Sequence, residues 1–491
     1  MLAYRLNSHD VKNQIFIPKY YDPELKTLLG SLSETHDLLC IGDLIDRNVL
    51  SVQAGHEIGK MAYGTGNIPF VRTSDISNWE IKTVPKQGVS NEIYLQYAEK
   101  EDVKAGDLLL VKDGTYLIGT NCIITSLDTP MLYQSHILKF RVLDTHIIDP
   151  YMLFLSFNNN LVHRQIKNLQ FTADIIDTLG KRYREIILPI PKDRTLQLEL
   201  IRKAKATIDT RTKYKAAIRQ MPKLIEAVLD TDSIKPFDDF FEKSIQEIAN
   251  DLVQDTTSSE FGSFSAFLMS NHNISNNIFL PKYYDPSISV TLKRLVSNCS
   301  LLSIAEMIDM GVISLSAGDE IGKMAYGTGE IPFVRTSDFS NWEIKSDAKQ
   351  GVSEEIYQQY AEKEDVQPGD ILVVRDGTYL VGTSCIITEL DKKMLYCGGL
   401  IKIRIESNEI IDPYLLLGLL NSYIVKRQMR TKQFTRDVID TMGQRFKEVI
   451  IPVPKSASLK TEISKRIQEI VEYRIKGRNI LYELSQDLTG F

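Results

Sequence analysis

The chain has 491 residues, of which 43% are hydrophobic and 25% are charged, and its formal net charge is −6. This length exceeds what one hydrophobic core supports, so several domains are expected. No apolar run reaches the roughly 20 residues of a membrane span, and the N-terminus lacks the apolar stretch of a signal peptide. We therefore expect no membrane partner. The five cysteines include no CxxC pair and are expected to be buried thiols, which fits a reducing cytoplasm. The negative net charge argues mildly against a free-standing nucleic-acid binder.

Two long segments of the sequence are nearly identical. Residues 55–82 and 318–345 match at 25 of 28 positions, at an offset of 263 residues. The same offset relates residues from about 16 to about 191 to their counterparts without a gap. This period is far longer than that of solenoid repeats, which is roughly 20–50 residues. The chain therefore contains a duplicated domain, and this suggests a pseudo-symmetric molecule for a pseudo-symmetric target.

Each repeat is rich in short β-forming runs that are broken by glycine, proline, asparagine and aspartate. The runs predict strands that include 68–72, 107–112, 122–125 and 371–375. An Asp-Pro-Tyr sequence in each copy predicts a helix, because aspartate caps a helix and proline suits its first turn. These helices start near Pro150 and Pro413, and each repeat closes on a Pro-x-Pro sequence that ends at Pro191 or Pro454.

After each repeat, the hydrophobic spacing changes to that of an amphipathic helix. The second region carries an apolar stripe at spacings of three and four residues: Leu459, Ile463, Ile467, Ile470 and Val471. The first region carries the equivalent stripe; we expect it to be interrupted near Pro222, to break around Pro236 and to resume over 240–253. The two stripes can bury against each other as an antiparallel coiled coil, which would fix the distance between the repeats.

Several kinds of catalytic site are missing from the sequence. Residues 55–60 lack the spacing of a phosphate loop, and 64–66 lack the third glycine of a dinucleotide-binding turn. No Asn-Pro-Pro-aromatic tetrapeptide of amino-methyltransferases occurs, and no histidines and cysteines have zinc-ligand spacing. A nucleophilic triad of Ser74, Asp75 and His136 is disfavoured, because the second copy has Gly399 in place of the histidine.

Each repeat offers a polar surface that suits DNA. Arginine can bind phosphate or the guanine edge with two hydrogen bonds, asparagine can pair with adenine, and aromatic rings can stack. In the first copy, the candidate DNA-binding residues are Arg72, Thr73, Ser74, Asp75, Asn78, Lys112, Tyr116, Gln134, His136, Lys167 and Arg182. In the second copy, they are Arg335, Thr336, Ser337, Asp338, Asn341, Arg375, Tyr379, Arg427, Arg430, Lys432, Arg436 and Arg445.

A structural interpretation of the same residues stays open. Trp79 and Trp342 could be core residues, with the neighbouring arginines paired to Asp75 and Asp338. The segment 426–447 holds seven Lys/Arg against two Asp, and 163–184 holds five against two. Such basic segments could face DNA or could be solvated helix faces.

The positions that differ between the copies are also informative. Gln134–His136 becomes Cys397–Gly399, residues 167–169 become 430–432, and Ala173 becomes Arg436. A shared scaffold with a few polar exchanges suits a reader of two related but unequal half-targets. Neutral drift after duplication is the alternative explanation.

The order of these parts resembles that of the specificity subunits of type I restriction-modification systems, over almost the whole chain. The matching pieces are IPFVRTSD, GDxLxVxDGTY, the Asp-Pro-Tyr helix and the IxxPxP exit into an amphipathic helix. The chain departs from that family where RTLQLE and SASLKTE replace the usual Glu-Gln after the exit prolines. The resemblance implies an α+β protein with mixed α/β target-recognition domains at 1–193 and 261–455. Helical spacers at 194–260 and 456–491 would pair as an antiparallel coiled coil.

The resemblance also implies a function without catalysis on this chain. The chain would read a bipartite, near-palindromic sequence in double-stranded DNA for a restriction-modification or related phage-defence complex. It would bind no cofactor itself and would dock two methyltransferase (M) subunits that carry S-adenosylmethionine; a motor-nuclease (R) subunit could join them. Two alternatives stay open: a protein-docking adaptor that does not bind DNA, and a nuclease or transferase with an unrecognised site.

Overall fold

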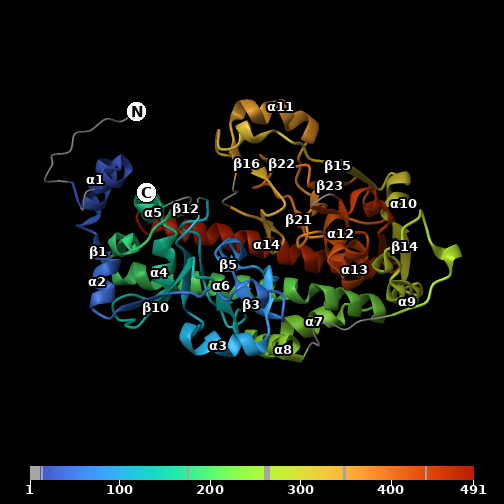
Figure 1. The fold of residues 1–491 in the computed structure, drawn as a ribbon, viewed down its shortest axis with the longest axis horizontal. Helices are drawn as coiled ribbons and strands as arrows, with labels where there is room; N and C mark the ends of the chain where they lie inside the picture. Colours follow the sequence, from blue (N-terminus) through green and yellow to red (C-terminus); the bar gives the residue numbers. More distant parts are fainter. Residues whose placement is uncertain are drawn as a thin grey trace.

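The computed structural model describes residues 11–12, 15–114, 116–173, 176–258, 266–346, 350–436 and 439–490. Two copies of one mixed α/β unit lie along a pair of long helices (Figure 1). In that view α2 (Ile41–Asp46) and α10 (Ile304–Asp309) lie at opposite ends, and α3 (Asn91–Glu101) and α11 (Glu354–Glu364) lie on opposite sides of the paired helices. The duplication in the sequence is therefore a pseudo-twofold arrangement in space.

The first unit follows the predicted alternation of short strands and helices. Its remaining helices are α1 (Pro23–Leu32), α4 (Pro150–Phe157) and α5 (Asn160–Leu169). Its strands are β1 (His36–Cys40), β2 (Leu50–Ala54), β3 (Ile68–Val71), β4 (Ile76–Ser77), β5 (Glu80–Ile81), β6 (Gln87–Val89), β7 (Leu108–Val111), β8 (Asn121–Ile123), β9 (Leu132–Tyr133), β10 (Ile137–Val142), β11 (Phe171–Ala173), β12 (Ile176–Thr178) and β13 (Ile187–Pro191).

The second unit repeats this order. Its remaining helices are α9 (Pro286–Leu295), α12 (Pro413–Leu420) and α13 (Tyr423–Thr431). Its strands are β14 (Cys299–Ser303), β15 (Ile313–Ala317), β16 (Ile331–Val334), β17 (Phe339–Ser340), β18 (Glu343–Ile344), β19 (Gly351–Val352), β20 (Ile371–Val374), β21 (Ser384–Ile386), β22 (Leu395–Tyr396), β23 (Leu400–Ile405), β24 (Phe434–Arg436), β25 (Ile439–Thr441) and β26 (Ile450–Pro454).

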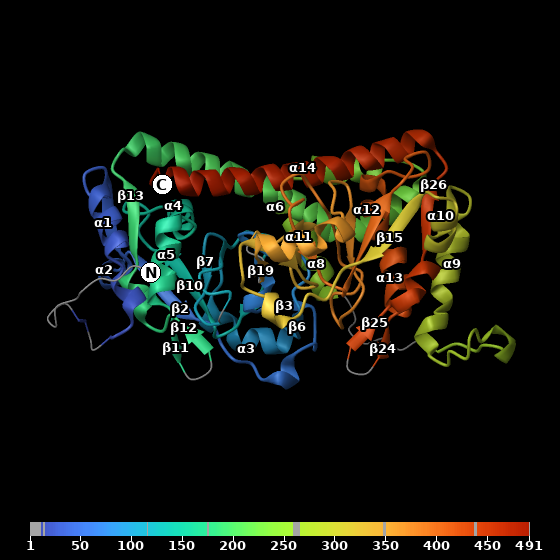
Figure 2. The ribbon, with the colours of Figure 1, turned by 90° about the horizontal axis from the view of Figure 1, so that it is seen from above.

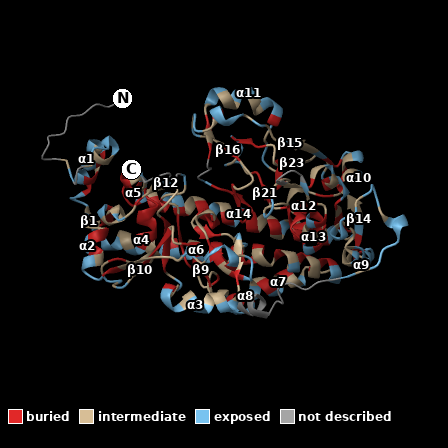
Figure 3. Cartoon of the chain, viewed as in Figure 1, coloured by how far each residue is buried: buried red, intermediate tan, exposed pale blue. Residues whose placement is uncertain are grey.

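Each unit contains a four-stranded antiparallel sheet, in the order β2-β10-β7-β8 or β15-β23-β20-β21. A three-stranded sheet lies beside it, β6-β3-β9 or β19-β16-β22, in which β3 pairs with β9 in parallel. The predicted Asp-Pro-Tyr helices are confirmed as α4 and α12. In α4, Asp149 accepts a hydrogen bond from the Tyr151 N–H at 2.7 Å, and residues 152–157 are buried. These nearly all-apolar helices join the sheets to the long helices (Figure 3).

The predicted helical regions form two long helices and a short extension. Helix α6 spans Arg194–Thr231 and α14 spans Ala457–Asp487. They run antiparallel: the Tyr214 and Tyr473 rings stack at 4.9 Å between centroids, and Arg211 of α6 contacts Gly477 of α14. The stripe residues Ile463, Ile467 and Ile470 are fully buried. The predicted fold class, two mixed α/β domains separated and followed by helices that pair antiparallel, is confirmed.

The prediction that the first helix is interrupted at Pro222 is wrong, because α6 continues through it. A proline in a helix costs about 3 kcal/mol. Met221 and Ile225 beside it are fully buried, and burial of two such side chains offsets about that amount. The predicted break lies just before Pro236: α6 ends at Thr231, and α7 (Lys235–Glu242) holds Pro236 in its first turn. The helix predicted over 240–253 is divided between the end of α7 and α8 (Ile245–Ser258).

The long helices hold the two repeats together. The first half of α6 and the last half of α14 pack on the first repeat, through residues such as Leu200, Ala204 and Leu481. The second half of α6 and the first half of α14 pack on the second repeat, through residues such as Ile225 and Ile467. Each repeat therefore shares a core with both helices.

Candidate nucleic-acid interface

In the first repeat, one loop and one hairpin form a continuous polar surface, which we call surface 1. The loop that follows β7 begins with Lys112 and Asp113, and the hairpin is β11–β12. Asp113 joins them: its carboxylate accepts a hydrogen bond from Thr178 Oγ1 at 2.5 Å and lies 2.9 Å from His136 Nδ1. Lys112 Nζ lies 3.8 Å from the same carboxylate. The candidates Lys112 and His136 thus belong to one site.

The hairpin of surface 1 is held by its own polar residues. Gln170 Nε2 and Thr172 Oγ1 donate to the two carboxylate oxygens of Asp177 at 2.9 and 2.5 Å. These hydrogen bonds, from Thr172 first and Gln170 second, lower the pKa of Asp177. The carboxylate therefore stays ionised and orders the base of the hairpin. Sequence reasoning missed Gln170 and Asp177, although the QFTxDxIDT pattern repeats both.

The second repeat presents the equivalent surface 2 with different contacts. Arg375 Nη2 lies 3.0 Å from Asp376 and donates to the Gly398 carbonyl at 2.6 Å. Gln433 Nε2 donates to the Thr378 carbonyl at 3.0 Å, which ties the loop to the β24–β25 hairpin. The exchange of His136 for Gly399 thus leaves Arg375 without a neighbouring imidazole. The two surfaces share a backbone frame and differ in their polar side chains.

The aromatic and threonine candidates lie next to these surfaces. Tyr116 and Tyr379 are 58% and 57% exposed, and Lys86 of the first repeat lies over the Tyr379 ring at 5.2 Å from its centroid. A Cβ at Gly399 would lie 2.9 Å from Thr336 Cγ2, which places the loop after β16 against surface 2. Thr73, Ser74 and Ser337 are half-buried in these loops. Arg436, where the first copy has Ala173, is the last residue of β24 on the same hairpin.

The arginines Arg72 and Arg335 are half-buried beside tyrosine rings, at 5.9 Å from the centroids of Tyr63 and Tyr326. The Nε atom of Arg72 is buried and has no hydrogen-bond partner among the described residues. Asp75 binds the backbone of Arg72, whose N–H donates to the Asp75 carboxylate at 3.0 Å, so the contact does not use the arginine side chain.

Four of the predicted DNA contacts are buried. Asp75 and Asp338 are 1% and 2% exposed, and both cap the turn that follows a strand. Asn78 and Asn341 are 3% and 7% exposed and lie between the two repeats. In this arrangement none of the four presents its polar atoms at the surface. Gln134 is also buried, at 8% exposure.

The two asparagines instead join the repeats. Each begins the two-residue turn of a hairpin, β4–β5 or β17–β18, with φ near +50°. Asn78 Nδ2 donates to Glu343 at 3.1 Å and to the Ile344 carbonyl at 3.0 Å. Asn341 Nδ2 donates to Glu80 and to the Ile81 carbonyl in the reciprocal arrangement. The core interpretation holds for Trp342, which is buried, and Trp79 packs edge-on against Phe154.

A buried charge cluster lies at the same junction, and sequence reasoning missed it. Its members are Glu80 and Glu343 from the hairpins and Arg211 and Arg474 from the long helices. Arg211 Nη1 and Nη2 donate to the two Glu343 oxygens, each at 3.2 Å, and Arg474 pairs with Glu80. Glu80 and Glu343, like Arg211 and Arg474, are 263 residues apart. A charged residue repeated within an apolar stripe could have revealed the cluster.

Some cations of the basic segments are paired within the chain. Arg427 Nε donates to Asp285 at 2.7 Å, and Lys432 Nζ pairs with Glu448 at 2.7 Å. Both residues are thus paired within the chain, and their role in phosphate binding stays a prediction. Arg182 and Arg445 donate to backbone carbonyls and stack on Phe171 and Phe434, so they hold the hairpins. Lys167 and Arg430 are exposed on α5 and α13.

Surfaces 1 and 2 lie on one side of the molecule. Figure 2 shows the β11–β12 and β24–β25 hairpins pointing the same way at the two ends, with α6 and α14 on the opposite side. Among the described residues, no group of three or more His, Cys, Asp or Glu side chains could hold a metal ion. No helix in the described ranges is long and apolar enough to cross a membrane.

No protein-family model matches the sequence, and a comparison with curated proteins finds no match. Among solved structures, the chain is similar to the S subunit of a type I restriction-modification system from M. genitalium. Identity is 12%, coverage is 92% of this chain and 96% of that one, and the TM-score is 0.36.

The second is the HsdS subunit from Thermoanaerobacter tengcongensis, with 14% identity, coverage of 93% of this chain and 96% of that chain, and a TM-score of 0.27. A third structure comes from work on complex assembly and conformational transition of the type I R-M system. It is 13% identical to this chain, with coverage of 93% of this chain and 97% of that chain, and the TM-score is 0.27. Since identities and TM-scores are low, functional residues are assigned from the geometry of this chain alone.

Proposed function

We propose that this chain is the DNA-recognition subunit of a type I restriction-modification complex or a related phage-defence complex. One observation carries the proposal: the same loop–hairpin surface is built twice, about a pseudo-twofold axis, on the side opposite the paired helices (Figure 2). A DNA duplex presents inverted half-sites with the same symmetry, so each repeat would read one half-site on opposite strands. Exposed tyrosines and a cation before each tight turn would supply contacts to the phosphates of the duplex.

The catalytic steps would belong to partners. Two methyltransferase subunits would bring S-adenosylmethionine, and a motor-nuclease subunit could join them. Their positive charge would also offset the net charge of −6 on this chain during DNA binding. The pure chain, incubated with DNA, labelled S-adenosylmethionine and magnesium, should then neither methylate nor cut; reproducible turnover would count against the proposal.

The target should have two similar inverted half-sites that are separated by an unread spacer. The half-sites should differ at a few positions, because the two surfaces differ at equivalent positions. Surface 1 has Lys112 and His136 where surface 2 has Arg375 and Gly399. Methylome sequencing of cells that carry the full system tests this. Two unrelated half-sites, or one continuous motif, would contradict it.

A further inference from the structure

The pseudo-twofold axis builds the same groove twice. Groove 1 is lined by Ile81, Lys82, Leu127, Asp128, Lys215 and Arg219. Groove 2 is lined by Ile344, Lys345, Leu390, Asp391, Arg478 and Tyr482, each 263 residues further along the chain. In both grooves a cation of the long helix faces an aspartate of the repeat: Lys215 lies 2.5 Å from Asp128, and Arg478 lies 3.4 Å from Asp391. The two grooves are therefore equivalent sites.

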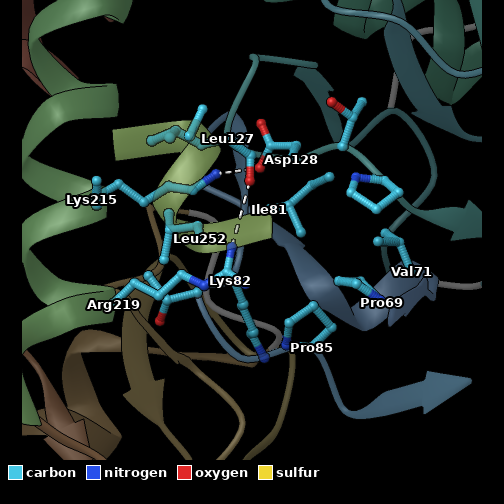
Figure 4. Close-up of a pocket in the computed structure, with 15 residues that line it drawn as sticks. Pro69, Val71, Ile81, Lys82, Pro85, Leu127, Asp128, Lys215, Arg219 and Leu252 are labelled. Atoms are coloured by element: carbon cyan, nitrogen blue, oxygen red, sulfur yellow. Dashed lines mark hydrogen bonds and ion pairs between the residues drawn. The ribbon is translucent and has the colours of Figure 1, made fainter. Parts of the chain in front are cut away.

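A helix of the chain itself occupies groove 1. Helix α8 places Ala249 and Leu252 against Leu127, and the close-up in Figure 4 shows Leu252 between Leu127 and Arg219. Both α8 residues are 4% exposed, Leu127 is 6% exposed, and a cavity of about 30 Å³ remains. The exposed side of α8 carries Glu247 and Asp251. Groove 1 therefore binds an amphipathic helix that carries carboxylates beside its apolar face.

Groove 2 has no such cover among the described residues. Its cavity is about 680 Å³. Leu390, the counterpart of Leu127, is 56% exposed, and Tyr482 is 51% exposed. Exposed apolar side chains that gather in a groove mark a binding site.

The charge of groove 2 defines its occupant further. Five Lys or Arg residues line it, against the single carboxylate of Asp391. Three of them are paired within the chain: Arg164 with Asp22 and Glu24, Lys393 with Glu354, and Arg478 with Asp391. Lys167 and Lys345 form no ion pair with another described residue, so they leave the groove with an excess of positive charge. Helix α8, which spans 245–258, has acidic residues and no basic ones. An acidic helix therefore fits groove 2 by charge as well as by shape.

We propose that groove 2 docks an acidic amphipathic helix of a partner protein, in the way that α8 occupies groove 1. The chain would fill one of two equivalent docking grooves with its own helix and leave the other for one partner helix. A partner helix would then bind groove 2 and not groove 1, although the two repeats are related by a pseudo-twofold axis. The proposal does not require the chain to bind DNA.

The test uses the full chain and a fluorescein-labelled peptide of residues 243–258. Short isolated helices are marginally stable, so saturable binding with a Kd of tens of micromolar is expected by fluorescence anisotropy. Leu390→Asp should weaken binding by about tenfold or more, because it places a carboxylate where the apolar face of the helix would pack. Val290→Asp is the matched control: Val290 is 68% exposed on α9, and this variant should bind as the wild type does.

A benzophenone at the Leu252 position of the peptide locates the site. Crosslinks to α14 fragments that contain Tyr482 support the proposal; crosslinks only to α6 around Arg219 show exchange with α8 and overturn it. No saturable binding, or equal binding to the Leu390→Asp variant, also overturns it. If that variant loses duplex DNA and keeps the peptide, groove 2 is a nucleic-acid surface and the proposal fails.

Discussion

Loss of the Glu343 charge should destabilise the centre of the molecule. The side chain is buried at 4% exposure for the residue. Burial raises its pKa, but Arg211, Arg474 and Arg478 outweigh burial and lower the pKa from 4.5 to about 2. Since each pH unit is worth about 1.4 kcal/mol, the ionised group contributes about 3 kcal/mol to folding at neutral pH. Removal of one partner from a buried ion pair costs a similar amount, about 3–5 kcal/mol.

The sign of the pH dependence follows from the lowered pKa. The contribution of Glu343 is fully present above the pKa of the unfolded state, near 4.5, and is lost as the pH falls toward 2. Glu343→Gln should therefore cost about 3 kcal/mol at pH 7 and about half of that or less at pH 3. For a urea dependence of about 3 kcal/mol per molar, this moves the unfolding midpoint at pH 7 by about 1 M.

Tryptophan fluorescence is a direct assay, because the chain has two tryptophans, Trp79 and Trp342, and both lie in the hairpin turns at this junction. Glu354→Gln is the matched control: Glu354 pairs with Lys393 at 2.8 Å on the exposed surface, where ion pairs contribute little. Coincident urea curves for the two variants at pH 7 would refute the reasoning. So would a cost of Glu343→Gln that does not shrink at pH 3.

Three further outcomes are expected. Charged substitutions at both Ile467 and Ile470, which are fully buried, should unfold the chain or separate the helices, as circular dichroism and size-exclusion chromatography would show; native behaviour of that double variant would argue against helix pairing. Lys112→Ala or Arg375→Ala should reduce the salt dependence of DNA binding by about one ion if either contacts phosphate, whereas an unchanged slope would remove that residue from the interface. His136→Gly should make the preferred half-sites more alike in a binding-site selection, since the second copy has glycine there; an unaltered motif would exclude His136 from base reading.

Local chemistry explains which parts of the fold could be predicted. The Asp-Pro pairs at 149–150 and 412–413 carry both a cap and a first-turn residue, and such signals act within a few residues. The apolar residues of α14 likewise recur at spacings of three and four, and this spacing by itself indicates a helix. The continuation of α6 through Pro222 could not be read in this way. It depends on the burial of Met221 and Ile225 in a core that the second repeat completes.

The candidate site was predicted less well for a related reason. The Asn-Trp pairs at 78–79 and 341–342 have the polar and aromatic character of a DNA-reading loop. Their positive φ values build tight hairpin turns instead, and each turn points into the other repeat. Only the relative placement of the repeats decides between the two roles. Lys112 and His136 lie together at surface 1 because Val111 of β7 pairs with Ile137 of β10, and the sequence pattern did not predict this pairing.

The rigid centre has a consequence for the length of the DNA spacer. Reciprocal hydrogen bonds of Asn78 and Asn341, the buried charge cluster and the paired helices all fix one repeat against the other. Helix α6, with 38 residues, is about 57 Å long at 1.5 Å per residue, so it spans both repeats. Surfaces 1 and 2 therefore keep one separation and one relative orientation.

One added base pair would move a half-site by about 3.4 Å along the duplex and rotate it by about 35°. A rigid reader cannot follow this rotation without breaking contacts or twisting the DNA, which costs energy. Duplexes with one base pair more or fewer in the spacer should then bind the assembled complex at least about tenfold more weakly than the natural target. Equal affinity across spacer lengths in a competition assay would mean that the two repeats move independently, which the buried junction does not allow.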